Sequence, residues 1–396
     1  MKKTCIQRIG GLLLSSAILF FSLSGSVSAA TTGVPSVSAK SAILIEASTG
    51  RVLFSKNERE KLPMASTTKI MSALLTLESG NLDKPFEVDG GAIMVEGSSM
   101  GLQKGDIVTR RTLAYGMLLP SGNDAAGAAA VSVAGSQSEF VAMMNKRAQM
   151  LGLDSTHFET PSGLDGKEHY STAWDMAMLA RTALQNPDFL EICSKSTAKV
   201  EFGNPPYTRY MTNHNRLVKE YKGCIGVKTG FTKKAGRCLV SAAEREGVRL
   251  IAVTLNAPND WSDHKKMFDY GFSVVKTSPL QVDVSDIRLK VVGGKTSEIK
   301  VIPAGYPTVC LSEEEQKKLT TKVLAPQFCY APVESGSLVG EIQYWYEDFM
   351  IASVSLLAQD SVEQNITPVQ YTFWEKVAMF FKNIYYNLLG FLQKIW

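Results

Sequence analysis

A serine and a lysine three residues apart begin a long apolar stretch near the start of the chain. Ser66 and Lys69 belong to the segment PMASTTKIMSALLTL, residues 63–77. A spacing of three puts both side chains on one face of a helix, and the residues that follow are apolar nearly all round, which predicts a buried helix. Burial lowers the pKa of an amine, so this pair suits a serine nucleophile and a lysine base. The unpaired N–H groups at the start of the helix would hold an oxyanion.

The S-x-x-K spacing does not single out this pair by itself, because the sequence contains it four more times. The other pairs are Ser196/Lys199, Ser262/Lys265, Ser273/Lys276 and Ser297/Lys300. Only Ser66 begins a long, wholly apolar helical segment, so further motifs must decide its role.

Two other short motifs could complete a site. Ser121-Gly122-Asn123 follows a predicted helix that stops at Pro120, although S-G-N also occurs at 79–81, where it suits a helix end. Lys228-Thr229-Gly230 occurs only once and lies on a predicted strand. Each motif alone is a weak signal, and only the set of three points to a defined chemistry.

The first thirty residues predict an export signal. Lys2, Lys3 and Arg8 precede an apolar segment at 12–23, and small residues at 27–29 offer a cleavage site. Its removal takes away three positive charges and no negative ones, so the net charge falls from +4 to +1. The chain is therefore expected to be exported, and its charge predicts no binding to nucleic acid.

The cysteines and histidines show no spacing typical of metal ligands. The cysteines outside the signal are Cys193, Cys224, Cys238, Cys310 and Cys329. We expect most of them to be small buried residues, with a Cys310–Cys329 or a Cys224–Cys238 disulfide left open. No metal or other cofactor is expected, and the scarcity of histidine favours a lysine as the base.

The order of predicted elements indicates a sheet with an attached helical subdomain, followed by a β domain. Residues 41–54 predict a hairpin and residues 222–255 predict further strands, with mainly helical segments between them. A helix over 260–275 completes this α/β part. From 280 to 361, short alternating segments separated by turns predict a small all-β domain.

The end of the chain predicts an amphipathic helix. From Phe373 onward, apolar residues recur at helical spacing and leave a narrow stripe of lysines and asparagines. Aromatic residues combined with lysines suit a helix that lies in a membrane interface. The predicted divisions are a signal at 1–30, a catalytic domain at 31–276, a β domain at 277–361, a linker at 362–372 and the helix at 373–396.

The set S-x-x-K, S-x-N and K-T-G, in this order, is the signature of the penicillin-binding and serine β-lactamase superfamily. Over residues 38–360 the chain closely resembles the low-molecular-mass penicillin-binding proteins that act as D-alanyl-D-alanine carboxypeptidases. The resemblance is carried by ASTTKIM (65–71), EGSSMGLQKGD (96–106), YGMLLPSGNDAA (115–126), HYSTAWDMA (169–177) and VKTGFTKKAGRCLV (227–240). It implies a penicillin-binding or β-lactamase-like transpeptidase fold followed by a small β-sandwich domain.

The same resemblance implies the catalytic residues. Ser66 would be the acylated nucleophile and Lys69 its base, while Ser121 would relay a proton near the leaving amine. The oxyanion hole would consist of the N–H of Ser66 and the N–H of Phe231.

The resemblance also implies how substrate is held. The Asn123 amide would bind the peptide group of the substrate, and Lys228 would attract the terminal carboxylate while its charge keeps the base neutral. Thr229 would hydrogen-bond that carboxylate. Gly230 would allow the substrate to lie beside the strand as an added edge.

The implied reaction removes the terminal D-alanine from a peptidoglycan stem pentapeptide. Ser66 attacks the penultimate carbonyl, D-alanine departs, and water hydrolyses the acyl-enzyme. β-Lactam antibiotics would act as covalent inhibitors. The protein would work at the outer face of the cytoplasmic membrane, bound peripherally through its last helix.

Two alternatives remain open at this point. A serine β-lactamase could share the scaffold, but class A enzymes deacylate with a glutamate in an E-x-x-x-N loop, and this sequence has none. A non-catalytic penicillin sensor or cell-wall binding protein would not require all three motifs.

Overall fold

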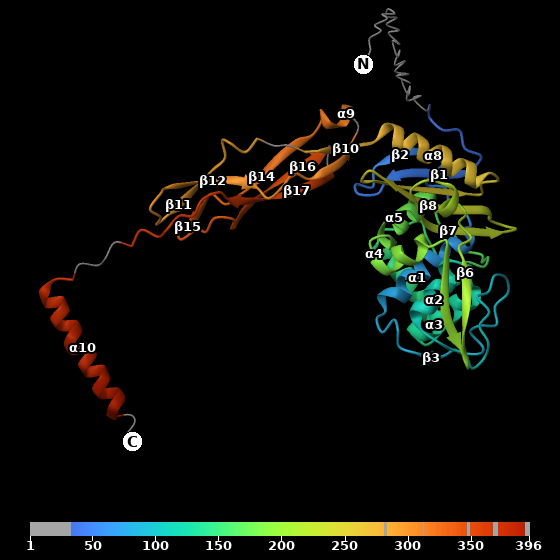
Figure 1. Ribbon diagram of the computed structural model, residues 1–396, viewed down its shortest axis with the longest axis horizontal. Helices are drawn as coiled ribbons and strands as arrows, with labels where there is room; N and C mark the ends of the chain where they lie inside the picture. Colours follow the sequence, from blue (N-terminus) through green and yellow to red (C-terminus); the bar gives the residue numbers. More distant parts are fainter. Residues whose placement is uncertain (1–32, 281–282, 312, 347–348, 367–370, 393–396) are drawn as a thin grey trace, which may run out of the picture.

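A five-stranded antiparallel sheet separates one long helix from a block of helices in the N-terminal domain (Figure 1). The computed structural model describes residues 33–280, 283–311, 313–346, 349–366 and 371–392. The predicted signal at 1–30 and the last four residues of the predicted tail lie outside the described residues.

The sheet has the order β2-β1-β9-β8-β7, which leaves β7 at one edge. Its strands are β1 Ser41–Glu46, β2 Val52–Lys56, β7 Cys224–Thr232, β8 Gly236–Arg245 and β9 Val248–Leu255. β1 and β2 form the hairpin predicted over 41–54, and β7 carries the K-T-G motif as predicted. An edge strand leaves one row of backbone groups open, so β7 can accept an extended peptide beside it.

Alternation along the strands builds a core on each face of the sheet. Ile43 and Ile45 of β1 pack in the cluster that contains the helical block. Leu44 faces the opposite way and packs with Phe268 of α8 (Asp260–Val274). Period-two alternation with both faces apolar is the pattern of a strand buried between two layers.

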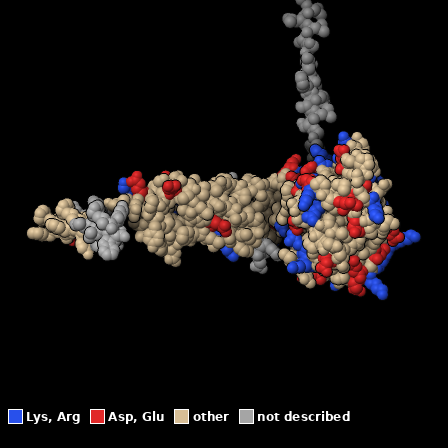
Figure 2. Space-filling view, turned by 90° about the horizontal axis from the view of Figure 1, so that it is seen from below, with Lys and Arg blue, Asp and Glu red and all other residues tan. Residues whose placement is uncertain are grey.

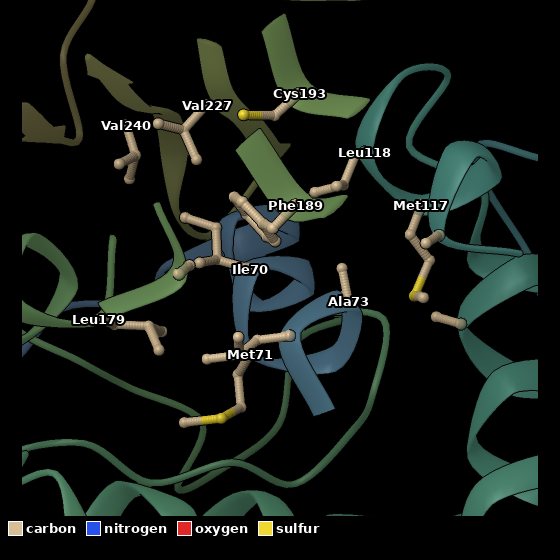
Figure 3. Packing of buried hydrophobic residues seen from close by; sticks show 14 of the residues in the cluster. Ile70, Met71, Ala73, Met117, Leu118, Leu179, Phe189, Cys193, Val227 and Val240 are labelled. Carbon is tan, nitrogen blue, oxygen red and sulfur yellow. The ribbon is translucent and has the colours of Figure 1, made fainter. Parts of the chain in front are cut away.

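The helical block is built around α1. Every residue from Lys69 to Leu77 in α1 (Lys69–Glu78) is buried, as the apolar sequence predicts. In Figure 3, Ile70 and Met71 of this helix lie in one cluster with Phe189 and Val227, so α1 joins the helices to the sheet. The remaining elements are β3 Phe86–Glu87, β4 Ile107–Val108, α2 Arg110–Leu118, α3 Asn123–Ala134, α4 Gln137–Met150, α5 Ala173–Ala183, α6 Pro187–Ser194, β5 Thr197–Gly203, β6 Pro206–Thr212 and α7 Leu217–Glu220.

The C-terminal β domain consists of a curled six-stranded sheet of order β14-β16-β17-β12-β11-β15 and a two-stranded sheet, β10-β13. Both sheets contribute to one core, in which Leu311 packs with Ile342 and Leu356. The elements are β10 Lys276–Pro279, β11 Arg288–Val292, β12 Glu298–Pro303, β13 Thr308–Leu311, α9 Glu313–Gln316, β14 Thr320–Leu324, β15 Phe328–Tyr330, β16 Leu338–Tyr346 and β17 Phe349–Ala358.

The cysteines of the described residues are all free thiols. Cys310 lies in β13, where its thiol contacts Gly247 O, and Cys329 lies in β15. Neither of the disulfides that the sequence left open is formed, and the cysteines act as packing residues instead.

The last helix, α10 (Phe373–Leu392), stands apart from both domains (Figure 1). Thr372 and Glu375 cap its start by reciprocal side-chain to backbone hydrogen bonds. The aromatic side chains of α10 up to Tyr386 are exposed, with Phe380 and Phe381 each 63% accessible. Figure 2 shows mixed basic and acidic side chains on the visible face of the N-terminal domain. The visible face of the β domain carries few charged side chains. None of the described helices is both long and apolar enough to cross a membrane.

Candidate active site

The nucleophile lies in a tight turn that precedes α1. The sequence predicted a helix from Ser66, but the structure has a 3₁₀ turn, η1 (Ala65–Thr68), and the α-helix begins at Lys69. The difference arises at Ala65, whose φ of +48° is left-handed and changes the chain direction. Ser66 is partly accessible, so the turn presents its hydroxyl to the cleft while α1 remains in the core.

The Lys69 amine is fully buried and lies beside the Ser66 hydroxyl. Its Nζ is 3.0 Å from Ser66 Oγ, 2.6 Å from Asn123 Oδ1 and 2.6 Å from Ser162 O. The last two are carbonyl oxygens, which only accept hydrogen bonds. A neutral amine has two hydrogens and one lone pair, so giving both hydrogens to the carbonyls directs the lone pair toward the Ser66 hydroxyl.

Electrostatics favour this neutral form. Burial lowers the pKa of Lys69 well below its usual value, and the positive charge of Lys228 lowers it further, while Asp124 opposes both effects. The arrangement therefore gives Ser66 a base that can remove its proton.

Asn123 is held at the start of α3 by both ends of its amide. Oδ1 accepts from Lys69, and Nδ2 donates to Glu96 O at 2.6 Å. Gly97, with φ +92°, makes this approach feasible, because a Cβ there would lie 2.8 Å from Asn123 Nδ2. One N–H of the amide remains without a protein partner in the described residues.

The neighbouring Asp124 ties the 98–102 loop to the same helix end. Its carboxylate accepts hydrogen bonds from Ser99 Oγ and from the backbone N–H groups of Met100, Gly101 and Leu102. A carboxylate in the first turn of a helix is also favoured by the helix dipole. Sequence reasoning missed this residue, although an acidic residue at a predicted helix start was the available signal.

Lys228 lies on β7 with only 1% of its surface accessible. Its Nζ donates to Thr229 O at 2.9 Å, and no carboxylate of the described residues pairs with it. Burial lowers the pKa of Lys228 to about 7. His214, whose pKa is lowered by burial and then by the positive charge of Lys228, lies in the same cleft and was also not predicted.

The cleft has a volume of about 320 Å³. It brings together Ser66, Ser121, Thr229, Gly230 and Phe231, which the sequence predicted from three separate motifs. It is also lined by Ser98, His214, Arg237, Asp260 and Trp261. Lys69 and Lys228 lie behind this lining as buried amines.

Ser121 is the one predicted catalytic residue without a contact to the amines. It is held with φ +64° directly before α3, and in the described residues its hydroxyl forms no hydrogen bond with Lys69 or Lys228. The described residues also contain no cluster of His, Cys, Asp and Glu that could hold a metal ion.

Gly230 sets the distance between β7 and the nucleophile turn. A Cβ on Gly230 would lie 3.0 Å from Met64 O and 3.1 Å from the backbone nitrogens of Ser66 and Thr67. The strand therefore lies directly against the backbone of η1. Only a residue without a side chain fits this approach without a shift of a few tenths of an ångström.

Comparison with known proteins agrees with this geometry. Residues 28–259 match the family of D-alanyl-D-alanine carboxypeptidases, and residues 283–364 match the C-terminal domain of penicillin-binding protein 5. The carboxypeptidase DacF of Bacillus subtilis is 33% identical over 341 residues, covering 82% of this chain and 86% of that protein. DacC of Escherichia coli is 32% identical over 374 residues, covering 89% of this chain and 92% of that protein.

A solved structure shows the same fold. Penicillin-binding protein 5 from Haemophilus influenzae superposes with a TM-score of 0.63 at 26% identity, covering 83% of this chain and 99% of its own. The predicted family and fold class are thus confirmed. The chain belongs to the D-alanyl-D-alanine carboxypeptidase family and is a serine-type D-Ala-D-Ala carboxypeptidase.

Proposed function

We propose that Ser66 is the acylated nucleophile of this carboxypeptidase and that Lys69 is its base. The observation that supports this most directly is the set of three contacts at Lys69 Nζ, two to carbonyl oxygens and one to Ser66 Oγ. The Ser66 oxygen attacks the penultimate carbonyl of a D-Ala-D-Ala end, and its proton passes to Lys69. The tetrahedral oxyanion accepts hydrogen bonds from the N–H groups of Ser66 and Phe231.

Collapse of this intermediate breaks the peptide bond. Ser121, which lines the cleft beside Ser66, relays the proton to the leaving amine, and D-alanine departs. Water then hydrolyses the ester on Ser66. Ser121 must receive this proton from Lys69, so the relay requires a hydrogen bond between the two side chains, direct or through a water, that forms when substrate is bound.

Substrate lies along the open edge of β7. Its terminal carboxylate meets Thr229 Oγ1 and the charge of Lys228, and its peptide carbonyl accepts the remaining N–H of Asn123. Gly230 permits the close approach of the strand, and Phe231 supplies its backbone N–H. The stem peptide of peptidoglycan is the substrate, and a β-lactam occupies the same positions as a covalent inhibitor.

The first experiment tests the nucleophile. The protein without its first thirty residues should release D-alanine from a peptide that ends in D-Ala-D-Ala, and labelled penicillin should attach covalently. Ser66→Ala should lower the release rate by at least about 10³-fold and abolish labelling. Ser196→Ala, at another S-x-x-K pair, is the matched control and should retain both activities. Full activity in Ser66→Ala would refute the assignment, and rapid loss of the penicillin adduct would indicate a β-lactamase.

The close approach of Gly230 gives a second prediction. Gly230→Ala should slow penicillin acylation by about 10-fold or more, because the new methyl group displaces β7 from the Ser66 amide and weakens the oxyanion hole. Gly305→Ala, where the added methyl group meets no atom within 4 Å, should leave the rate unchanged. Equal rates in both variants would show that β7 need not touch the turn.

The Lys228 amine predicts an alkaline limit to the reaction. With a pKa of about 7, Lys228 is charged below that pH and neutral above it. The second-order rate of penicillin acylation should therefore fall as pH rises through about 7, since the attraction for the penicillin carboxylate is lost. Lys228→Arg keeps its charge to much higher pH and should not show this fall. A wild-type rate that stays level to pH 9 would contradict the role.

We further propose the divisions 31–276 and 277–361 for the catalytic domain and β domain, with α10 as a peripheral anchor on the outer face of the cytoplasmic membrane. The linker predicted over 362–372 begins later than 362, because Val362 packs in the core of the β domain and pairs with Val333. The exposed aromatic side chains of α10 support the anchor, since no domain of the described chain covers them. An exported enzyme with such an anchor would be held beside its peptidoglycan substrate.

Liposome binding tests the anchor. A chain that ends at Ile366 keeps Val362 in the core of the β domain, so it should keep carboxypeptidase activity but no longer sediment with liposomes of anionic lipid. In the full chain, Ile384→Asn should weaken binding by about 10-fold or more, because it places an amide in the apolar layer. Asn383→Ser, on the polar stripe, serves as the control. Unchanged sedimentation of the shortened chain would exclude α10 as the anchor.

A further inference from the structure

The peptide unit between Ala65 and Ser66 contains an N–H and a C=O group that have different roles. Its N–H belongs to Ser66 and is the oxyanion donor of the proposed function, on which this inference rests. Its C=O belongs to Ala65 and points in the opposite direction within the same peptide plane. Because a peptide unit is planar, whatever fixes the Ala65 carbonyl also fixes the direction of the Ser66 N–H.

A buried hydroxyl holds that carbonyl. Thr68 Oγ1 donates to Ala65 O at 2.8 Å, and Thr68 has no accessible surface. The same oxygen lies 2.8 Å from His169 Nε2. A hydroxyl has one hydrogen, and here it is given to Ala65 O, so the hydrogen between Thr68 and His169 must come from the imidazole.

The other ring nitrogen agrees with this assignment. His169 Nδ1 lies 2.9 Å from the backbone nitrogen of Glu159, which can only donate. Nδ1 therefore carries a lone pair and Nε2 carries the hydrogen. His169 is 3% accessible, and burial lowers its pKa to about 4, which keeps the ring neutral near pH 7. All hydrogen bonds run in one direction, from Glu159 through His169 and Thr68 to Ala65 O.

Two glycines confine the same peptide from either side. A Cβ on Gly163, whose φ is +85°, would lie 2.1 Å from Ala65 O. A Cβ on Gly230 would lie 3.1 Å from Ser66 N. The peptide plane is thus packed against a loop on its carbonyl side and against β7 on its amide side.

We propose that Thr68 and His169 are positioning residues that orient the Ala65–Ser66 peptide and polarise its N–H toward the oxyanion. A hydrogen bond accepted by a carbonyl draws electron density from the amide nitrogen, which strengthens the N–H as a donor. The effect applies when negative charge develops on the substrate oxygen and not when substrate first binds. The HYSTAWDMA stretch (169–177) carries the family resemblance, but the resemblance assigned no role to any of its residues. This proposal assigns a positioning role to His169, its first residue.

Single substitutions separate this function from simple packing. Thr68→Val keeps the shape of the side chain and removes the hydroxyl, whereas Thr68→Ser keeps the hydroxyl. His169→Leu removes both ring nitrogens, whereas His169→Gln offers an amide oxygen to Glu159 N–H and an amide N–H to Thr68. Labelled penicillin reports the acylation rate constant and the non-covalent dissociation constant separately, and a peptide boronic acid reports stabilisation of a tetrahedral adduct.

The expected loss lies in the acylation step. Thr68→Val and His169→Leu should lower the acylation rate constant and the affinity for the boronic acid by about 10-fold to 100-fold, while the non-covalent dissociation constant changes less than threefold. Thr68→Ser should recover to within about threefold of wild type, and His169→Gln should lie between His169→Leu and wild type.

Three results would overturn the proposal. They are wild-type acylation in Thr68→Val, an equal loss in Thr68→Ser and Thr68→Val, or a loss confined to the non-covalent step and the melting temperature. If Thr68→Val and His169→Leu do not fold, Thr68→Cys is compared with Thr68→Ser, because the thiol takes the place of the hydroxyl but donates only weakly. Equal acylation rate constants in these two variants would also overturn the proposal. Failure of the proposed function itself would appear differently, as wild-type protein that penicillin does not label at Ser66.

Discussion

The burial of one amine, that of Lys69, governs the site. A lysine inside a folded domain is costly as a cation, and its nearest charged neighbours pull in opposite directions, with Lys228 disfavouring and Asp124 favouring the charge. The protein meets this cost with two carbonyl acceptors rather than with a carboxylate. A carboxylate in contact would have stabilised the ammonium form, which cannot accept a proton.

The site also requires that the backbones of β7 and η1 keep fixed positions relative to each other. The sheet ends at β7, so one strand can face a peptide substrate and the nucleophile turn at the same time. Glycine at Gly230 and at Gly163 lets backbone approach backbone on both sides of η1. The catalytic groups therefore come from three sequence regions that are joined by main-chain packing, and the helices behind them keep that packing rigid.

Much of this could be predicted from the sequence. The apolar residues after Lys69 predict a buried helix. The single K-T-G motif, on a predicted strand, predicts the second element that builds the site. The role of Ser162 could not be predicted, because it acts through a backbone carbonyl that any residue type would supply. The hairpin of β5 and β6 was also missed, although Thr197–Gly203 alternates between exposed and buried positions. The 3₁₀ turn depends on the left-handed Ala65, a conformation that alanine does not favour and that only tertiary packing can impose.

Lys228 has a consequence for the stability of the domain. Its amine is buried, and among the described residues its hydrogen-bond acceptors are the backbone oxygen and hydroxyl of Thr229. Below its pKa of about 7, Lys228 is therefore a buried cation without a carboxylate partner among the described residues, and this lowers the free energy of unfolding. An anion that enters the cleft supplies the missing charge, and by mass action it stabilises the fold as it binds. Substrate thus acts as a structural component of the domain, and the resting enzyme gives up part of its stability to make that binding favourable.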